Sequence, residues 1–458
     1  MHVFRKVLIA VGVIAKAPGV LIAVALLVLA HTAHALPAKA DQTVIVLTSF
    51  SEDYVAPIKQ AFMKRHPDIR LRFLYKKTPA AVAHILSGRG PVPDVFIASA
   101  VDAFESLKAS GRLVSFSGGG SQQQGIRDKV ILNDRDGFYR GIALSGYGVM
   151  WNDAYLFRLG LSAPHSWGDL LQPQYAGHIG LTSPTRSGTT HIIVEMILQR
   201  YGWERGWAYL QELAGNLATI TARSFGVRDG VLKERFGLGL VVDFFALGPR
   251  YRQQPVAFSY LDETTLVPAS GAMIRGGANP KAALTFLNFL TSLPGQELLR
   301  HPDLMRLPVR ADAYRVFPDD FPNPFVEGRF VETRPFDRAL SSRRYHLVNA
   351  MFDRLITYRL HSLREVWGKL HALEGREEAS IDHSKLREAR RVLTSVPVGA
   401  MMAADDAFLS QFSRVQPGVA YSSMQTRLDV EWKRYGDHAI KQAEQLLQQA
   451  APVEGKSP

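Results

Sequence analysis

The sequence has no cysteine in its 458 residues. This absence excludes disulfide bonds, thiol catalysis, cysteine-bound zinc and iron–sulfur centres. It does not assign a compartment, because a cysteine-free chain is tolerated in oxidising and in reducing surroundings.

The motifs of several enzyme classes are also missing. There is no G-x-S-x-G elbow and no H-E-x-x-H helix. Gly237-Leu-Gly239 lacks the third glycine of a dinucleotide fingerprint, and the 14 histidines are scattered. The sequence therefore predicts neither an enzyme nor a protein with a resident cofactor or metal.

Long apolar runs are absent beyond the N-terminal region, so no later segment offers the roughly 18 apolar residues of a spanning helix. Arg5 and Lys6 precede the apolar run 20–30, and small residues follow at Ala33 and Ala35. This order predicts a signal peptide over residues 1–35 and export to the periplasm. An uncleaved N-terminal anchor is the alternative, and both interpretations place the rest of the chain outside the cytoplasmic membrane.

Acidic residues are fewer than basic ones, 42 against 54, which gives a formal charge of +12. Three of the basic residues lie in the first 35 positions, and the remainder carries +9. This excess weakly favours an anionic ligand. Nucleic acid is not an expected partner for an exported protein.

The first part of the body alternates strand and helix patterns. Residues 43–48, 69–75 and 94–98 have strand patterns, and helical patterns separate them. This βαβαβ order predicts an α/β domain with a doubly wound sheet. Ligands of such sheets lie at the carboxyl ends of the strands. Thr48, Ser49 and Ser99 occupy those ends and offer hydroxyl groups.

A second candidate site lies between the predicted strand 179–183 and a helix that begins near Thr189. The first turn of a helix has four unpaired N–H groups and the positive end of the helix dipole. Gly188 admits a ligand to the backbone, Ser187 and Thr189 add hydroxyl donors, and Arg186 adds a guanidinium. These residues predict an anion site. The alternative is an ordinary serine N-cap.

Two further polar positions are candidates. Ser224 lies in a small polar loop, and Asp243 ends the predicted strand 238–242. Asp243 is interpreted either as a ligand for an amine or hydroxyl group or as a cap or hinge salt bridge.

The motifs P-x-S-W-x-D-L from Pro164, S-P-x-x-S-G-T from Ser183 and G-W-x-x-G-W from Gly202 follow one another in order. Asn279-Pro280 then begins a helix pattern that runs to Gln296. Over residues 42–310 this order resembles the periplasmic solute-binding proteins of ABC importers. The similar branch takes iron(III), 2-aminoethylphosphonate and related solutes.

The resemblance implies a type II periplasmic-binding-protein fold with two α/β lobes. Lobe one would comprise residues 42–146 and 258–310, and lobe two residues 150–250. Val149–Asn152 and Ala257–Tyr260 would be the crossovers between them. Residues 330–458 form a C-terminal helical extension, which either packs on lobe one or offers a docking surface to another domain.

The resemblance also implies a binding site in the cleft between the lobes for a small anionic solute, a phosphorylated or carboxylated metabolite. Both lobes would contribute to it. The residues carried over by position are Thr48, Ser49, Ser99 and Ser145 from lobe one, and Arg186, Ser187, Gly188, Thr189, Ser224 and Asp243 from lobe two.

Several functions remain open for such a receptor, which we expect to be a monomer. It would deliver its solute to a membrane permease, or signal to the periplasmic domain of a sensor kinase that controls phosphoglycerate transport, because the resemblance is strongest to members with that regulatory role. Iron-binding members carry two adjacent tyrosines where this sequence has Phe244 and Phe245, which argues against an iron(III) receptor. A secreted phosphohydrolase is the remaining alternative.

Overall fold

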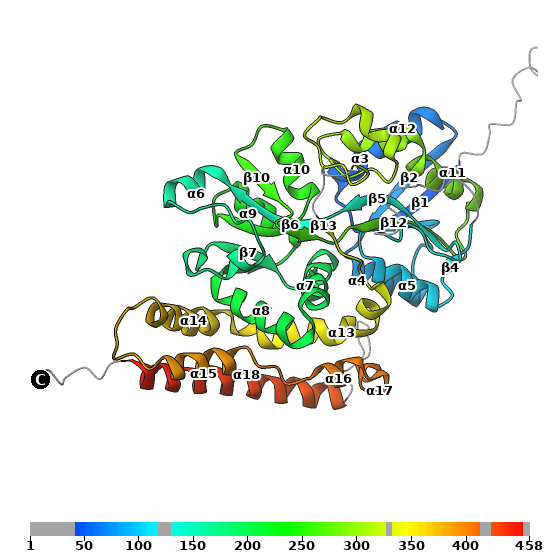
Figure 1. Ribbon diagram of the computed structural model, residues 1–458. Coiled ribbons are helices and arrows are strands. Elements are labelled where there is room, and N and C mark those ends of the chain that lie inside the picture. The colour runs from blue at the N-terminus through cyan, green and yellow to red at the C-terminus, as the bar shows by residue number, and fades with distance from the viewer. Residues whose placement is uncertain (1–41, 117–129, 327–331, 413–422, 452–458) are drawn as a thin grey trace, which may run out of the picture.

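The computed structural model describes residues 42–116, 130–326, 332–412 and 423–451, so the predicted signal peptide at 1–35 lies outside the described residues. Two α/β lobes stand side by side, and a layer of helices runs along one side of them (Figure 1). Within the described ranges, no helix is both long enough and apolar enough to cross a membrane.

Lobe one is built on a sheet in the order β2-β1-β3-β12-β4, with β5 also paired to β12. β1, β2 and β3 are parallel, whereas β12 is antiparallel to its neighbours. The βαβαβ order predicted for residues 43–98 is confirmed. The elements are β1 (Gln42–Thr48), α3 (Glu52–Arg65), β2 (Ile69–Tyr75), α4 (Thr78–Ser87), β3 (Val95–Ala98), α5 (Val101–Ala109), β4 (Leu113–Val114), β5 (Tyr139–Ser145), β12 (Val267–Ile274), α11 (Pro280–Thr291) and α12 (Leu293–Glu297).

Lobe two has a sheet in the order β10-β6-β9-β7-β8, in which β7, β8 and β9 are parallel. Its central strand β9 is buried along its whole length, as expected for a strand covered on both faces. The elements are β6 (Tyr147–Asn152), α6 (Asp153–Leu159), β7 (Ile179–Thr182), η3 (Pro184–Arg186), α7 (Gly188–Tyr201), α8 (Trp203–Asn216), β8 (Leu217–Thr221), α9 (Ser224–Leu232), β9 (Leu238–Val242), α10 (Phe244–Tyr251) and β10 (Val256–Ser259).

The chain crosses between the lobes at Gly146, and again between Tyr260 and Leu266. The predicted crossovers Val149–Asn152 and Ala257–Tyr260 were wrong, because nearly all of these residues pair with each other as β6 and β10 inside lobe two. Their apolar side chains pack in that sheet, and the chain turns at the small residue instead. A Cβ on Gly146 would lie 2.6 Å from the Tyr260 ring, so the two crossovers pass close together.

The predicted helical extension is present and packs chiefly on lobe two. Apolar side chains of the extension and of lobe two form one continuous core. Of the two alternatives for the extension, packing on lobe one is therefore wrong, and a docking surface for another domain stays a prediction. α8 shows the reason: ten of its fourteen residues are buried, including Trp203, Trp207 and Gln211 on the face that meets the extension, so it needs cover beyond lobe two itself. The helices are α13 (Arg338–Leu355), α14 (Leu360–Glu374), α15 (His383–Leu393), α16 (Ala400–Ala404), α17 (Asp406–Ser410) and α18 (Ser423–Ala450), which form a layered bundle (Figure 1).

The root of the extension is attached to the second crossover. There β11 (Glu263–Thr264) pairs in parallel with β13 (Glu332–Thr333), just before α13 begins. The second crossover and the start of the extension are thus joined by a short two-stranded ladder.

Candidate functional site

Arg306 lies at the boundary between the lobes and is completely buried. Three aromatic rings surround its guanidinium, whose carbon lies 4.6 Å from the ring centre of Phe50, 4.9 Å from Tyr54 and 3.9 Å from Phe244. Phe50 and Tyr54 belong to lobe one, and Phe244 belongs to lobe two. The lobes therefore meet around a buried cation.

The backbone of the same loop is held against β5. Leu307 O accepts a hydrogen bond from Leu144 N at 2.7 Å, and Arg306 N donates to Leu299 O at 3.2 Å. Met305 has a φ of 37°, a left-handed conformation that is costly for a residue with a side chain. These constraints turn the Arg306 side chain toward the lobe boundary.

The guanidinium of Arg306 retains hydrogen-bonding capacity. Its Nη2 donates to Ser99 Oγ at 3.0 Å, whereas its Nε and Nη1 have no hydrogen-bond partner among the described residues. Buried donors of a charged group are expensive to leave without partners. Two donors of a fixed cation at a lobe boundary are suited to an anionic oxygen.

Two buried hydroxyl groups at the first crossover also lack hydrogen-bond partners. Ser145 Oγ and Tyr147 OH, on either side of Gly146, have no hydrogen-bond partner within the described part of the chain. Burial raises the pKa of Tyr147, and the charge of Asp243 raises it further while that of Arg306 lowers it. Tyr147 thus stays a neutral hydroxyl donor at physiological pH.

Asp243 joins the two crossovers. Its Oδ2 accepts hydrogen bonds from Gly146 N at 2.7 Å and from Tyr260 OH at 3.0 Å, and its Oδ1 accepts from Phe244 N at 2.8 Å. Burial raises the pKa of Asp243 to about 7, against the lowering effects of the Gly146 hydrogen bond and of Arg306. With both oxygens engaged, this carboxyl group has the geometry of the cap and hinge alternative.

The start of α7 faces lobe one. A Cβ on Gly188 would lie 3.0 Å from Ala100 Cβ and 3.8 Å from Thr78 Oγ1, both in lobe one. Ser187 Oγ accepts from Thr190 N at 3.2 Å, which is the N-cap bond. The helix terminus therefore points to the boundary between the lobes.

Arg186 and Thr189 flank this terminus, and both are half-buried. Arg186 N donates to Ser183 O at 3.0 Å, but its side chain makes no hydrogen bond or ion pair with the described residues, so its guanidinium is available. The hydroxyl group of Ser183, just before them, is occupied by Asp353 Oδ1 at 2.6 Å.

The other predicted residues have different surroundings. Thr48 is buried, and its Oγ1 accepts from Phe50 N at 3.0 Å, so it shapes the loop that carries Phe50. Ser49 is half-buried beside it. Ser224 is half-buried at the start of α9, and no hydrogen bond joins it to the Arg306 cluster in the described structure.

Sequence reasoning missed Arg306 together with Tyr54 and Tyr147. One signal was present, because Arg306 is a lone basic residue within the apolar stretch 304–309, broken only by Pro308. A charged residue in such a stretch is seldom buried without a role.

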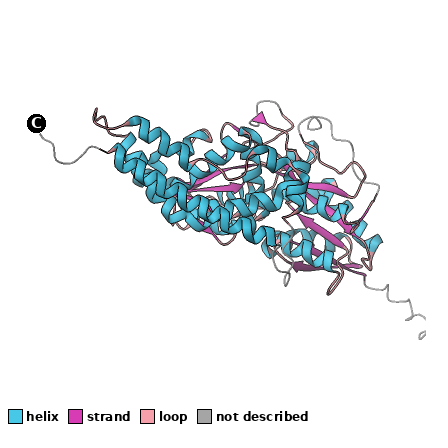
Figure 2. Ribbon diagram, turned by 90° about the horizontal axis from the view of Figure 1, so that it is seen from below, coloured by secondary structure: helices cyan, strands magenta, loops and turns pink. Residues whose placement is uncertain are grey.

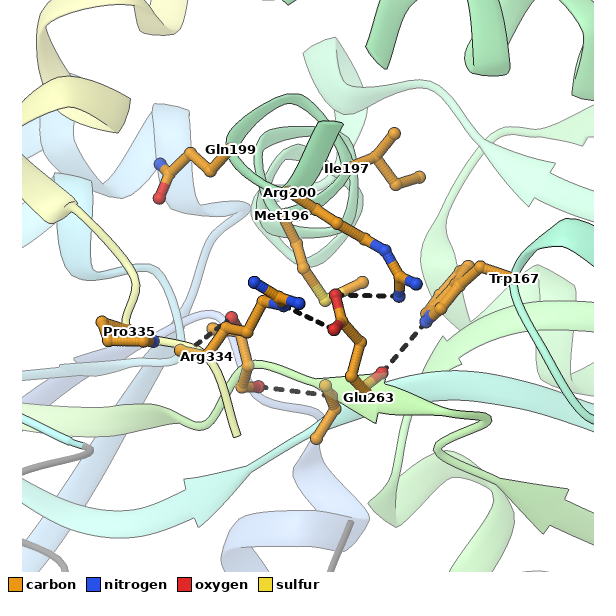
Figure 3. A pocket seen from close by; sticks show the side chains of 10 residues that line it. Trp167, Met196, Ile197, Gln199, Arg200, Glu263, Arg334 and Pro335 are labelled. Atoms are coloured by element: carbon orange, nitrogen blue, oxygen red, sulfur yellow. Dashed lines mark hydrogen bonds and ion pairs between the residues drawn. The ribbon is translucent and has the colours of Figure 1, made fainter. Parts of the chain in front are cut away.

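A small pocket of about 40 Å³ lies elsewhere, between α7, the second crossover and the root of the extension (Figure 3). Glu263 is at its centre and pairs with Arg200 Nη1 at 2.8 Å and with Arg334. Trp167 Nε1 donates to Glu263 O at 3.0 Å. The volume suits a water molecule rather than a metabolite, so these contacts fasten the crossover and do not form the solute site.

Comparison with known sequences gives consistent results. A family model described as a bacterial extracellular solute-binding protein matches residues 90–338. The chain is 29% identical over 375 residues to the phosphoglycerate transport regulatory protein PgtC of Salmonella typhimurium, covering 81% of this chain and 90% of that protein. An uncharacterised protein of Haemophilus influenzae is 28% identical over 170 residues, which cover 35% of this chain and 46% of that protein.

Solved structures share the fold. The periplasmic binding protein AfuA from Actinobacillus pleuropneumoniae, with fructose-6-phosphate bound, has a TM-score of 0.58 at 16% identity, covering 68% of this chain and 98% of that one. The apo ferric ion-binding protein A of Pasteurella haemolytica has a TM-score of 0.53 at 14% identity, covering 68% of this chain and 97% of that one. The predicted two-lobe α/β fold with a helical extension is confirmed.

Proposed function

Because the chain belongs to the bacterial extracellular solute-binding protein family, whose members bind solutes rather than catalyse reactions, we propose that it captures a small anionic solute between its lobes with Arg306 as the principal anion-binding group. The observation that carries this proposal is the buried guanidinium with two donors not used by the described protein atoms. An anion that receives those donors would compensate a charge that is otherwise buried at a cost.

The surroundings of Arg306 support an anion over a neutral solute. Ser99 fixes one nitrogen, and the three rings restrict the guanidinium plane, so the remaining donors are oriented before the solute arrives. The N-terminus of α7, with Arg186, Ser187, Gly188 and Thr189, faces the same boundary and adds a positive dipole end. Ser145 and Tyr147 would add neutral hydroxyl groups.

Lobe closure follows from the origin of these groups. Phe244 covers Arg306 from lobe two, whereas Ser99, Phe50 and Tyr54 come from lobe one. The complete cage therefore exists only when the lobes meet, so the solute stabilises the closed form by its greater affinity for that form.

We propose a phosphorylated or carboxylated three-carbon metabolite as the solute, with phosphoglycerate as the first candidate. The resemblance to the regulatory protein of phosphoglycerate transport supports this choice. Iron(III) is a weaker candidate, because Phe244 and Phe245 offer no ligand atoms and no group of three His, Cys, Asp or Glu side chains suited to a metal occurs in the described residues.

We further propose that the protein works in the periplasm after removal of residues 1–35, and that it acts in the regulation of transport rather than only in delivery to a permease. The match to the regulatory protein supports this role. It covers 81% of the chain, which is more than residues 1–326 can supply, so it includes part of the extension. The match to the binding protein AfuA covers 68% of this chain.

The experiment is calorimetry of the purified chain with 3-phosphoglycerate, 2-phosphoglycerate, phosphoenolpyruvate, citrate and ferric citrate. Saturable binding of at least one phosphorylated acid, lost in Arg306→Met, is the expected result. Binding of ferric citrate alone, or binding of a phosphorylated acid that Arg306→Met leaves unchanged, would overturn the proposal.

A further inference from the structure

Helix α13 contacts both lobes. It lies against α7 and η3 of lobe two and against α5 of lobe one, with the rest of the extension layered beyond it (Figures 1 and 2). A helix in this position either fastens the lobes together or follows one of them when they part. The contact of α13 with lobe two differs in chemistry from its contact with lobe one. This difference indicates whether α13 holds both lobes together or moves with one of them.

The contact of α13 with lobe two is a buried interface of the kind that does not separate in the folded protein. Arg344 donates to both oxygens of Glu195 on α7, at 2.8 and 2.7 Å, and both side chains are buried. Asn349 Oδ1 lies 2.9 Å from His191 Nδ1. Breaking a buried bidentate pair leaves a buried charge without its partner, which is strongly unfavourable.

Asp353, at the far end of α13, strengthens that attachment. Its carboxylate accepts hydrogen bonds from Ser183 Oγ at 2.6 Å and from Thr185 Oγ1 at 2.7 Å. The apolar side chains of α13 and α14 also belong to the same core as those of α7 and α8. The extension and lobe two are therefore one folded body.

The contact with lobe one is close but polar. Asp102 on α5 lies with its Oδ2 3.6 Å from Nε2 of His191, and that nitrogen lies 3.2 Å from Ser341 Oγ of α13. The apolar clusters of lobe one contain no residue of the extension. Small polar side chains allow close approach without a shared core, which is the character of a surface that can separate.

We propose that the extension moves with lobe two as a single body and that α13 is a latch which closes on α5 only when the lobes close. The contact of Asp102 with His191 and Ser341 then exists in the closed form alone. The extension begins beside the second crossover. Its position relative to lobe one would therefore differ between the open and the closed form, and this difference would be accessible on the surface of the molecule. This inference rests on the proposed function only in that the lobes open and close.

The cysteine-free sequence permits a direct test with spin labels at three exposed positions. Gln60→Cys reports lobe one, Phe157→Cys lobe two and Arg387→Cys the extension. Pairwise distance distributions are measured in the full chain and in Gly188→Trp. That substitution wedges the lobes apart without any ligand, because even a Cβ at this position would lie 3.0 Å from Ala100 Cβ.

We expect the lobe one–lobe two and lobe one–extension distributions to change together in Gly188→Trp, while the lobe two–extension distribution stays the same. A change between lobe two and the extension would overturn the inference. So would a folded wedge variant in which no distribution changes, since α13 would then fasten both lobes. Absence of anion binding in calorimetry would overturn the proposed function. The spin-label distances would still test the latch, because they are measured without a ligand.

A second variant covers the case in which Gly188→Trp does not fold. Asp102→Arg places a larger, cationic side chain at this buried contact beside His191, which disfavours the closed form. We expect it to raise the open population in the lobe one–extension distribution and to leave the lobe two–extension distribution unchanged. Broadening of the latter distribution, or no effect on the former, would contradict the latch.

Discussion

Replacement of Arg306 by methionine separates a role in binding from a role in folding. Methionine keeps an unbranched chain of similar length among Phe50, Tyr54 and Phe244, but it removes the charge. The variant loses the hydrogen bond to Ser99 and the cation–π contacts with the rings. It also no longer has the desolvation cost of a buried guanidinium. Replacing a buried charge by an apolar group of similar volume is often neutral or stabilising. We expect the free energy of unfolding to change by less than about 2 kcal/mol.

The affinity responds very differently. Nε and Nη1 of Arg306 are each free to donate a charge-assisted hydrogen bond to the solute. Such bonds contribute about 1.5–3 kcal/mol each, so the lower value for both gives a loss of ~3 kcal/mol. Since every 1.4 kcal/mol is tenfold in Kd, the dissociation constant should rise at least about a hundredfold.

Arg344→Met is the matched control. Arg344 is also a buried arginine beside an aromatic ring, with its guanidinium carbon 5.2 Å from the ring centre of Trp203, but Glu195 takes its donors. Removing one partner of a buried pair costs about 3–5 kcal/mol of stability. We expect Arg344→Met to lose stability, while the solute affinity of its folded fraction is retained.

Urea unfolding and calorimetry with the bound phosphorylated acid, on both variants, form the assay. The reasoning is refuted if Arg306→Met binds within threefold of the parent. It is equally refuted if Arg306→Met is destabilised as strongly as Arg344→Met, because Arg306 would then be a structural residue.

Three further predictions concern Arg186, Asp243 and a pair of glycines. Arg186→Ala should weaken solute binding by ~1.5–3 kcal/mol in calorimetry without lowering Tm, because its side chain makes no hydrogen bond or ion pair with described residues; unchanged affinity would remove it from the site. The raised pKa of Asp243 means that the folded chain holds this proton more tightly than the unfolded chain, so stability should fall as pH rises from about 4 toward 7. Urea titrations should show a smaller fall in Asp243→Asn, and an equal fall would contradict the assignment. Gly180→Ala should destabilise by ~1–3 kcal/mol, because its Cβ would lie 2.2 Å from the Phe236 ring, whereas Gly368→Ala meets nothing within 4 Å and should cause no loss.

The parts of the candidate site that could be predicted are those that short sequence patterns indicate. Thr48 and Ser99 were predicted as site residues because apolar strand patterns end at or just before them, and the start of α7 was predicted because small hydroxyl residues precede a helical pattern. Arg306 could not be found in this way. It lies in an irregular loop, and only the return of the chain through the second crossover brings it beside Ser99, 207 positions earlier in the sequence.

The extension shows the same limit. Its helices were predictable from apolar spacing, since periodicity is a local property. The lobe on which it packs depends on which surface needs cover. That requirement is visible in α8, where Trp203, Trp207 and Gln211 are buried on one face, and Trp203 Nε1 and Gln211 Nε2 donate to Val398 O and Ser395 O of the extension. A Cβ on Gly215 of α8 would lie 2.6 Å from the Trp367 side chain, so a small residue is needed where α14 approaches.

Asp243 explains why closure and binding are one movement in the proposed receptor. Its carboxyl group holds Gly146 of the first crossover and Tyr260 of the second, so it fixes the point about which the lobes turn. It also accepts from the backbone of Phe244, whose ring covers Arg306 from lobe two. A change in the crossovers therefore moves that ring directly. Because the ring is placed by the hinge itself, the cage around the cation cannot be completed while the lobes remain apart, so the proposed anion would bind the closed form more tightly than the open form.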